Sequence, residues 1–328
     1  MNQKYLAYAF SELVAKLLQS GYSYTPLSHP GTGRIYRFTG PNDRAPQYAL
    51  KIYERGLTLR DREVAEIVHH EVCGLWNIER TQRFRFPRLY GAVDNMILME
   101  FMPGKLFQSL HNELDQTALS AIYRRAVVAL AAVHSSIGQV KDRRFLPARF
   151  REATLAKRLP YQVQVISGEG LRNYEGKIGS VGDGWAEMLK RLPLERVISD
   201  LAVTSGGFLS QGDFKPDNLL VMESGEICVL DWAGVCKAKP WYDLAYLLLE
   251  IPREQWDEYV QLYLDEMRKV GFLTEVTPKA ASPLLVSGTV FQQIARAKAN
   301  VKYMATRDDP HHLNEFRAAL DGLVSLLA

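Results

Sequence analysis

The sequence has few cysteines, no long apolar run and almost no net charge, and each feature argues against a class of protein. The only cysteines are Cys73, Cys228 and Cys236, an odd number without C-x-x-C spacing, so neither a disulfide framework nor a structural zinc site is expected. No run of 18 apolar residues occurs, which argues against a transmembrane helix. Forty basic and 37 acidic residues give a net charge of only +3, too little for a dedicated nucleic-acid surface. We therefore expect a cytoplasmic protein with reduced thiols that binds neither nucleic acid nor membrane.

The apolar periodicity of the N-terminal third predicts a small lobe rich in strands. The chain has 328 residues and is 47% hydrophobic, which is typical of a soluble globular protein with two domains or lobes. Residues 34–39 and 48–53 alternate as strands do, residues 60–79 have helical spacing, and residues 96–102 form a short apolar strand. Pro103-Gly104 ends that strand, so the first lobe is predicted to span residues 1–103.

The remainder, residues 104–328, is predicted to be a larger, mainly helical lobe. Helical spacing is found in residues 119–134, 241–250, 254–270 and 287–304. Two short apolar runs at 219–222 and 227–230, separated by a turn, indicate one hairpin. The predicted fold class is therefore α+β with two lobes, and the sequence indicates no oligomeric state.

Three polar residues lie around this hairpin. Asp213 and Asn218 precede the first strand of the hairpin, and Asp231 follows the second. An amide and carboxylates supplied by neighbouring elements make an oxygen site suited to Mg²⁺.

This segment resembles the core of the aminoglycoside phosphotransferase and choline kinase family, the small-molecule branch of the protein-kinase-like fold. The shared pattern is G-D-x-x-x-x-N, a hairpin and an apolar strand that ends in D-W, with 18 positions from Asp213 to Asp231. The resemblance implies that Asp213 is the catalytic base and that Asn218 and Asp231 hold Mg²⁺ on the phosphates of ATP. An ordinary loop whose Asp and Asn residues make turns is the alternative.

Lys51 is similar to the family's phosphate-binding lysine, because it lies in the apolar strand 48–53. A lone strand lysine is also typical of a sheet edge or an exposed surface, so it needs a carboxylate partner. Glu71 falls within the apolar stripe of helix 60–79, where an unpaired charge would cost several kcal/mol, roughly. Glu71 is therefore the expected partner, with Glu66 as the second choice.

The nucleotide-binding residues are predicted mainly from position. Gly31 and Gly33 lie in a predicted turn ahead of the lysine strand. This turn either covers the phosphates of the nucleotide or has no role beyond reversing the chain. By resemblance to the linker between lobes, the backbone at Glu100 and Met102 would face adenine.

Two positions in the catalytic segment differ from the usual pattern of the family. Gln211 stands where the family usually has His, two residues before Asp213. Lys215 is typical of serine/threonine protein kinases, and it would add positive charge where the transition state is negative, unless it is a solvated loop residue.

The short segment after Asp231 decides between acceptors. Only 11 residues separate it from Asp243, and no A-P-E triplet follows, so a peptide platform does not fit. We expect an ATP- and Mg²⁺-dependent phosphotransferase for a hydroxyl of a small molecule: an aminoglycoside, amino alcohol or sugar-like compound. A serine/threonine protein kinase and a nucleotide-binding pseudokinase are the alternatives. Acidic and aromatic residues of segment 256–266 would either line the acceptor pocket or form a wet helix face.

Overall fold

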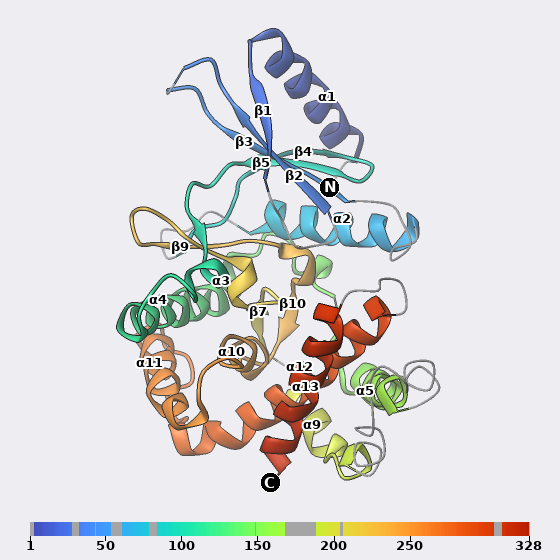
Figure 1. Cartoon of the computed structure of the whole chain (residues 1–328), viewed down its shortest axis with the longest axis vertical. Coiled ribbons are helices and arrows are strands. Elements are labelled where there is room, and N and C mark those ends of the chain that lie inside the picture. Colours follow the sequence, from blue (N-terminus) through green and yellow to red (C-terminus); the bar gives the residue numbers. More distant parts are fainter. Residues whose placement is uncertain are drawn as a thin grey trace. The chain divides into compact units, whose positions relative to one another are not determined.

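The computed structural model describes residues 3–27, 33–42, 44–53, 61–78, 84–147, 149–167, 188–203, 206–304 and 310–327 (Figure 1). The chain folds into two compact units, the first made of Met1–Leu146 with Gln211–Val235 and the second of Pro147–Ser210 with Cys236–Ala328. The two units are defined by the contacts that residues make within each unit. The predicted division into a nucleotide-binding lobe, 1–103, and a helical lobe, 104–328, is a division by function and stays a prediction.

A five-stranded antiparallel sheet forms the first part of unit 1, in the order β1-β2-β3-β5-β4. Its strands are β1 (Ser23–Leu27), β2 (Gly33–Thr39), β3 (Tyr48–Tyr53), β4 (Leu89–Val93) and β5 (Met96–Glu100). The strand that carries Lys51, β3, is central, so both of its edges are paired. A central strand holds its side chains more rigidly than an edge strand would, and the edge interpretation of Lys51 is wrong.

Two helices accompany this sheet: α1 (Gln3–Gln19), which packs against β4, and α2 (Asp61–Asn77). Phe10 and Leu17 of α1 join three sheet residues, Phe38, Tyr48 and Leu98, in one hydrophobic cluster. The structure confirms, to within two residues, the predicted strands 34–39 and 48–53 and the predicted helix 60–79. Strand β5 ends at Glu100, two residues before the predicted end of the strand 96–102.

The sequence pattern did not predict β1 and β4. Proline is usually a signal against a strand, but Pro26 pairs with Tyr36 on the edge strand β1. An edge strand accommodates proline because the missing N–H can belong to its unpaired side.

The rest of unit 1 contains the hairpin and its neighbours. Its elements are β6 (Lys105–Leu106), α3 (Phe107–Leu110), α4 (Gln116–Ser135), β8 (Leu219–Val221), β9 (Ile227–Val229) and the short 3-10 turns η1 (Ser136–Gln139), η2 (Arg143–Phe145), η4 (Pro216–Asn218) and η5 (Trp232–Gly234). The predicted hairpin is confirmed, and its strands form a three-stranded sheet in the order β6-β8-β9. The side chain of Asp115 accepts a hydrogen bond from the Ala118 N–H at 2.8 Å, which caps the start of α4.

Unit 2 is mainly helical. It consists of α5 (Glu152–Ser167), α9 (Leu194–Leu201), β7 (Phe208–Ser210), β10 (Cys236–Ala238), α10 (Trp241–Leu247), η6 (Arg253–Gln255), α11 (Trp256–Lys269), α12 (Pro278–Met304) and α13 (Pro310–Leu327). Helix α12 begins nine residues before the predicted start at Ser287, with Pro278 at its first position and Pro283 inside it. Pro278 removes no hydrogen bond of the helix, since the first four N–H groups have no partner within it. Pro283, five residues further on, removes one such bond.

Helix α11 contradicts the hypothesis of an acidic and aromatic acceptor pocket. Its aromatic side chains, Trp256, Tyr259 and Tyr263, are buried in the core, whereas Asp257 and Glu258 are exposed. Alternating exposure of this kind is that of an ordinary amphipathic helix. The wet-face alternative is therefore the correct one.

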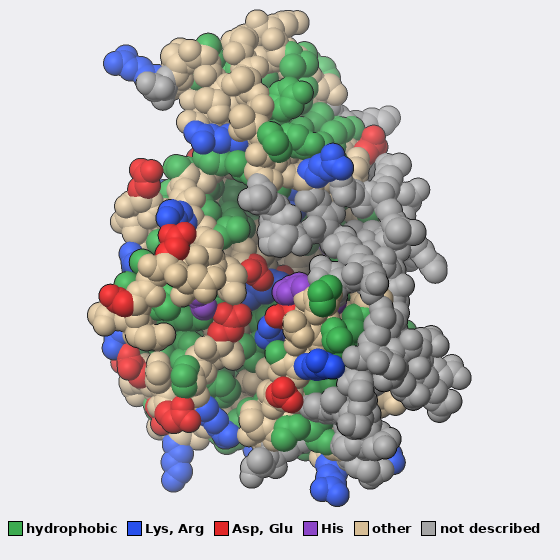
Figure 2. Space-filling view, viewed as in Figure 1, with side chains coloured by type: hydrophobic (Ala, Val, Ile, Leu, Met, Phe, Trp, Pro, Cys, Tyr) green, Lys and Arg blue, Asp and Glu red, His purple; other side chains and the backbone are tan. Residues whose placement is uncertain are grey.

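The surface agrees with the small net charge. On the face shown in Figure 2, basic and acidic side chains of the described residues are interspersed and form no broad area of one sign. None of the described helices is both long enough and apolar enough to cross a membrane.

Candidate active site

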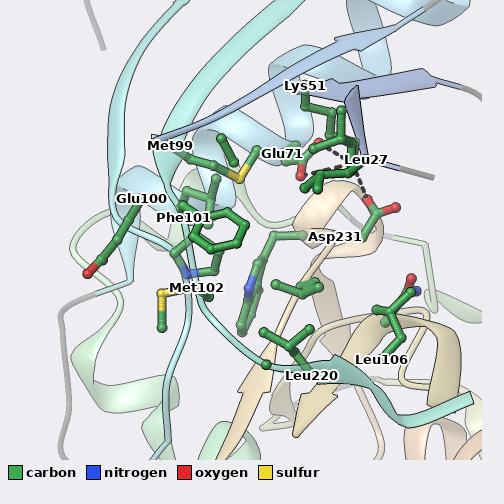
Figure 3. A pocket seen from close by; sticks show the side chains of 18 of the residues that line it. Leu27, Lys51, Glu71, Met99, Glu100, Phe101, Met102, Leu106, Leu220 and Asp231 are labelled. Carbon is green, nitrogen blue, oxygen red and sulfur yellow. Dashed lines mark hydrogen bonds and ion pairs between the residues drawn. The ribbon is translucent and has the colours of Figure 1, made fainter. Parts of the chain in front are cut away.

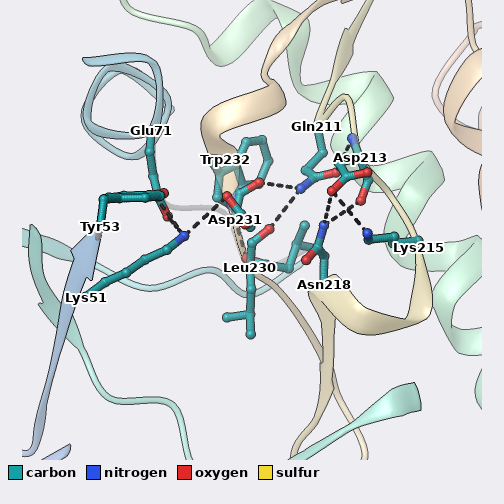
Figure 4. A network of polar contacts seen from close by, with 11 residues as sticks. Lys51, Tyr53, Glu71, Gln211, Asp213, Lys215, Asn218, Leu230, Asp231 and Trp232 are labelled. Atoms are coloured by element: carbon teal, nitrogen blue, oxygen red, sulfur yellow. Dashed lines mark hydrogen bonds and ion pairs between the residues drawn. The ribbon is translucent and has the colours of Figure 1, made fainter. Parts of the chain in front are cut away.

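Lys51 of β3 lies between two carboxylates within unit 1. Its Nζ is 3.0 Å from Glu71 Oε2 and 3.3 Å from Asp231 Oδ1 (Figure 4). Lys51 and Glu71 are only 5% and 2% exposed. The predicted pair is confirmed, while Glu66 lies on the exposed face of α2. Helix α2, strand β3 and the turn after β9 each supply one member of this arrangement.

Burial and the neighbouring charges together shift the pKa values of Lys51 and Glu71. Burial by itself lowers the pKa of Lys51, but the carboxylates of Asp231 and Glu71 outweigh it, so the pKa lies above its ordinary value. Burial raises the pKa of Glu71, and the ammonium of Lys51 opposes that rise. The lysine is thus held as a cation inside the protein.

Asp213, Asn218 and Lys215 form a second group on the loop before β8. The Asn218 Nδ2 donates to the Asp213 backbone oxygen at 2.8 Å and to the Asp213 Oδ2 at 2.7 Å. Lys215 Nζ lies 3.7 Å from the same Oδ2 and 3.6 Å from Asp217 Oδ2. The Asp213 side chain is 38% exposed, so its carboxylate is accessible from solvent. The hydrogen bonds from Asn218 hold the loop that carries it.

Gln211 connects the two polar groups. Its Nε2 donates to the backbone oxygens of Leu230 at 2.9 Å and Asp231 at 2.6 Å, and its Oε1 accepts from the Asp213 N–H at 2.8 Å. Gln211 is fully buried. An amide offers donors and an acceptor at once, whereas a neutral imidazole offers one of each. Gln211 therefore joins the loop of Asp213 to the turn after β9, which carries Asp231.

Two glycines let these segments approach each other. Gly212 has φ +87°, and a Cβ placed on it would lie 2.0 Å from the backbone oxygen of Gly234. A Cβ on Gly234 would lie 2.8 Å from the Gln211 backbone oxygen. Asp231 itself adopts left-handed backbone angles, φ 51° and ψ 71°. Only glycine fits at position 212, because any side chain would collide with the opposite backbone.

A cavity of about 280 Å³ in unit 1 adjoins Lys51 (Figure 3). Most of its lining is apolar, and Lys51, Glu71, Asn218 and Asp231 supply polar groups on its wall. The apolar lining comprises Leu27, Ile35, Ala49, Leu75, Pro87, Met99, Phe101, Met102, Leu106, Leu220, Leu230 and Trp232. The cavity thus combines a mainly apolar space with charged groups on its wall, as a ligand with an apolar ring and an anionic group requires.

The remaining predicted nucleotide residues are placed as follows. Glu100 and Met102 line the cavity, and the Glu100 side chain points away from Lys51 and Asp231 in Figure 3. Gly33 is the first residue of β2 and pairs with Tyr53. Gly31 lies outside the described residues. Leu27 and Ile35, on the strands before and after that turn, both line the cavity.

Sequence reasoning did not select Tyr53, whose hydroxyl donates to Glu71 Oε2 (Figure 4). Its position two residues after Lys51, on the same face of β3, was the available signal. Within the described part of the chain, no group of three or more His, Cys, Asp or Glu side chains has the geometry of a metal site.

The helices and sheets of this chain form a protein-kinase-like fold, as predicted. The model of the phosphotransferase enzyme family (APH) matches residues 23–273, and the chain belongs to this family. The prediction of a phosphotransferase is thereby confirmed. No curated protein gives a significant match to the sequence.

Solved structures of similar proteins agree with this fold. The choline kinase LicA from Streptococcus pneumoniae is 15% identical, with a TM-score of 0.56 over 96% of this chain and 99% of that one. ADP-bound aminoglycoside phosphotransferase APH(2'')-Ib is 16% identical, with a TM-score of 0.56 over 96% and 97%. Macrolide 2'-phosphotransferase MphH from Brachybacterium faecium is 13% identical, with a TM-score of 0.57 over 94% and 98%. At such low identity these likenesses concern the fold alone.

Proposed function

We propose that this protein transfers the γ-phosphoryl group of ATP, with Mg²⁺, to a hydroxyl group of a small molecule. The observation that carries the proposal is the position of Lys51, paired with Glu71 and Asp231 at the polar end of an apolar cavity. A buried cation beside a mainly apolar cavity matches the two parts of a nucleotide, its phosphates and its base. The ADP-bound relative of the same family supports nucleotide use.

Lys51 would contact the α- and β-phosphates, with Glu71 holding its ammonium in place. The apolar walls of the cavity would hold adenine, with the backbone of Glu100 and Met102 along its edge. Gly31 and Gly33 would lie over the phosphates. Leu27 of β1 and Ile35 of β2 both line the cavity, which supports this proposal.

Asn218 and Asp231 fit a magnesium ion. Both line the cavity, and both offer the oxygen ligands that Mg²⁺ prefers. Because Asn218 Nδ2 is bound to Asp213, the carbonyl oxygen of the amide is directed away from it and is available to a cation. When bound, Mg²⁺ would neutralise charge on the phosphates, and one carboxylate with one amide is a typical protein contribution to such a site.

Asp213 would accept the proton of the attacking hydroxyl, since its carboxylate is accessible and its loop is anchored by Asn218 and Gln211. Lys215, 3.7 Å from that carboxylate, would stabilise negative charge on the phosphoryl group in the transition state of its transfer. We also propose a cytoplasmic location, where ATP is available and where the three buried free thiols stay reduced.

The acceptor is proposed to be an aminoglycoside, an amino alcohol or a sugar-like compound. The family match supports a phosphotransferase, and the segment of 11 residues between Asp231 and Asp243 leaves no space for a peptide platform. A choline kinase and an aminoglycoside phosphotransferase are among the proteins that share the fold.

A test is ATP consumption by the purified protein with Mg²⁺ and a panel of aminoglycosides, choline, amino alcohols and sugars. We expect turnover with one acceptor class and at least a hundredfold loss of kcat in Asp213→Asn, with nucleotide affinity retained. Tight Mg²⁺–nucleotide binding without transfer to any acceptor would favour a pseudokinase. Autophosphorylation that depends on Asp213 would favour a protein kinase.

A further inference from the structure

Tyr53 belongs to the same strand and the same face as Lys51. Residues two apart on a strand point to the same side of the sheet, and both side chains are buried, with Tyr53 only 2% exposed. The Lys51 ammonium lies 4.7 Å from the centre of the Tyr53 ring, over its face, and the Tyr53 hydroxyl donates to Glu71 Oε2. One aromatic residue therefore touches both members of the ion pair (Figure 4).

The backbone of Tyr53 is fixed where β3 ends. Its N–H donates to the Asn95 backbone oxygen at 2.8 Å, and Asn95 Nδ2 donates back to the Tyr53 backbone oxygen at 2.5 Å. On the other side, Tyr53 pairs with Gly33 of β2. The ring is thus held by the sheet, whereas Glu71 comes from helix α2. The phenol is a link from the rigid sheet to the helix.

Glu71 receives three hydrogen bonds in a site almost closed to water. Lys51 Nζ donates to Oε1 at 3.1 Å and to Oε2 at 3.0 Å, and Tyr53 adds the third bond. A buried carboxylate needs such donors to remain ionised. Without the phenol, Lys51 would be the remaining donor among these contacts, and the same ammonium is also drawn toward Asp231 at 3.3 Å.

We propose that Tyr53 is a positioning residue of the phosphotransferase: its hydroxyl anchors Glu71, and its ring supports the Lys51 ammonium, so that the lysine is held in place for the nucleotide phosphates. The assignment rests on the proposed function of Lys51. It predicts that loss of one oxygen atom from Tyr53 weakens nucleotide binding although that oxygen never touches the nucleotide.

The chain provides a matched control on the same strand. Tyr48 is also buried in β3, but it is an odd number of residues from Tyr53 and belongs to the opposite face, in the cluster with Phe10 and Phe38. Tyr53→Phe and Tyr48→Phe each remove one hydroxyl and keep the ring. Only the first change removes a hydrogen bond to Glu71.

The experiment measures ADP affinity by calorimetry in MgCl₂, the KM for ATP, kcat and the thermal midpoint for both variants. We expect Tyr53→Phe to weaken ADP binding and raise the KM for ATP about tenfold, and Tyr48→Phe to change both less than twofold. In a Glu71→Gln background the Tyr53→Phe change should lose most of its effect, because residues that act through one another are not additive.

Equal nucleotide affinity in Tyr53→Phe and the wild type would overturn the assignment, as would a full additional loss in the Glu71→Gln background. If both Phe variants lost nucleotide affinity equally, in proportion to a fall in thermal midpoint, Tyr53 would be a packing residue and not a positioning residue. A wild-type protein that binds no nucleotide would instead refute the proposed function, and the role of Tyr53 with it.

Discussion

The ammonium of Lys51 is shared by Glu71 and Asp231, at 3.0 Å and 3.3 Å, and the two carboxylates come from the two separate sequence segments that make up unit 1. Glu71 is almost fully buried, whereas the Asp231 side chain is 32% exposed. Loss of Lys51 therefore leaves the Glu71 carboxylate without its cation in a low-dielectric site.

Lys51→Met is therefore expected to cost stability as well as activity. Removal of one partner of a buried pair costs roughly 3–5 kcal/mol. The double variant Lys51→Met, Glu71→Gln should recover part of that loss, because no buried carboxylate then lacks its cation, yet it should remain inactive. Urea unfolding together with ATP turnover separates the two effects. A double variant less stable than Lys51→Met would contradict the pairing.

Gln211→Leu is predicted to destabilise unit 1 by at least about 2 kcal/mol, because two backbone oxygens and one N–H lose their buried partner and each unsatisfied group costs roughly 1–3 kcal/mol. Gln211→His, which introduces the residue usual in the family, should lose less, since an imidazole keeps a donor and an acceptor. Denaturant midpoints and kcat of both variants provide the measurement. A histidine variant as damaged as the leucine variant would argue against this hydrogen-bond account.

Gly212→Ala should be far more damaging than Gly206→Ala. Both glycines have positive φ, +87° and +71°, but only a Cβ at 212 meets backbone, at 2.0 Å, while nothing lies within 4 Å at 206. Gly206→Ala should cost about 1 kcal/mol, the strain of the left-handed conformation alone. Gly212→Ala should add the collision and abolish turnover. Similar unfolding midpoints for the two variants would show that the contact with Gly234 is not tight in solution.

The three cysteines should react slowly in the folded protein. All are buried, and burial raises the pKa of the Cys236 thiol to about 12. A thiol with a raised pKa stays protonated, so at pH 8 and at pH 9 Cys236 should react far more slowly with a disulfide reagent than an ordinary thiol near pKa 8.5 would. Reagent uptake before and after denaturation, with peptide mapping, provides the measurement. Rapid modification of Cys236 at pH 8 in the folded state would be the contrary outcome.

Several elements of the fold follow from local pattern. The alternation of residues 48–53, the helical stripe around Glu71 and the turn between the hairpin strands each specify their element within a few residues. Strand β1 and the first nine residues of α12 did not, because proline is read locally as a break. Pro26 is accommodated because β1 is an edge strand, and Pro278 because the first N–H groups of α12 have no partner within the helix.

The site divides in the same way. The sequence by itself determined the candidate residues, since Lys51, Glu71, Asp213, Asn218 and Asp231 could be selected by type, spacing and resemblance to a family. Only the tertiary structure decided that one ammonium is shared by two carboxylates and that the Gln211 amide joins the two loops by hydrogen bonds. The contact between the Tyr53 hydroxyl and Glu71 was also found only in the tertiary structure. Pattern carries information about neighbours along the chain, whereas these contacts join strand, helix and loop segments that are distant in sequence, and their geometry exists only once the elements pack.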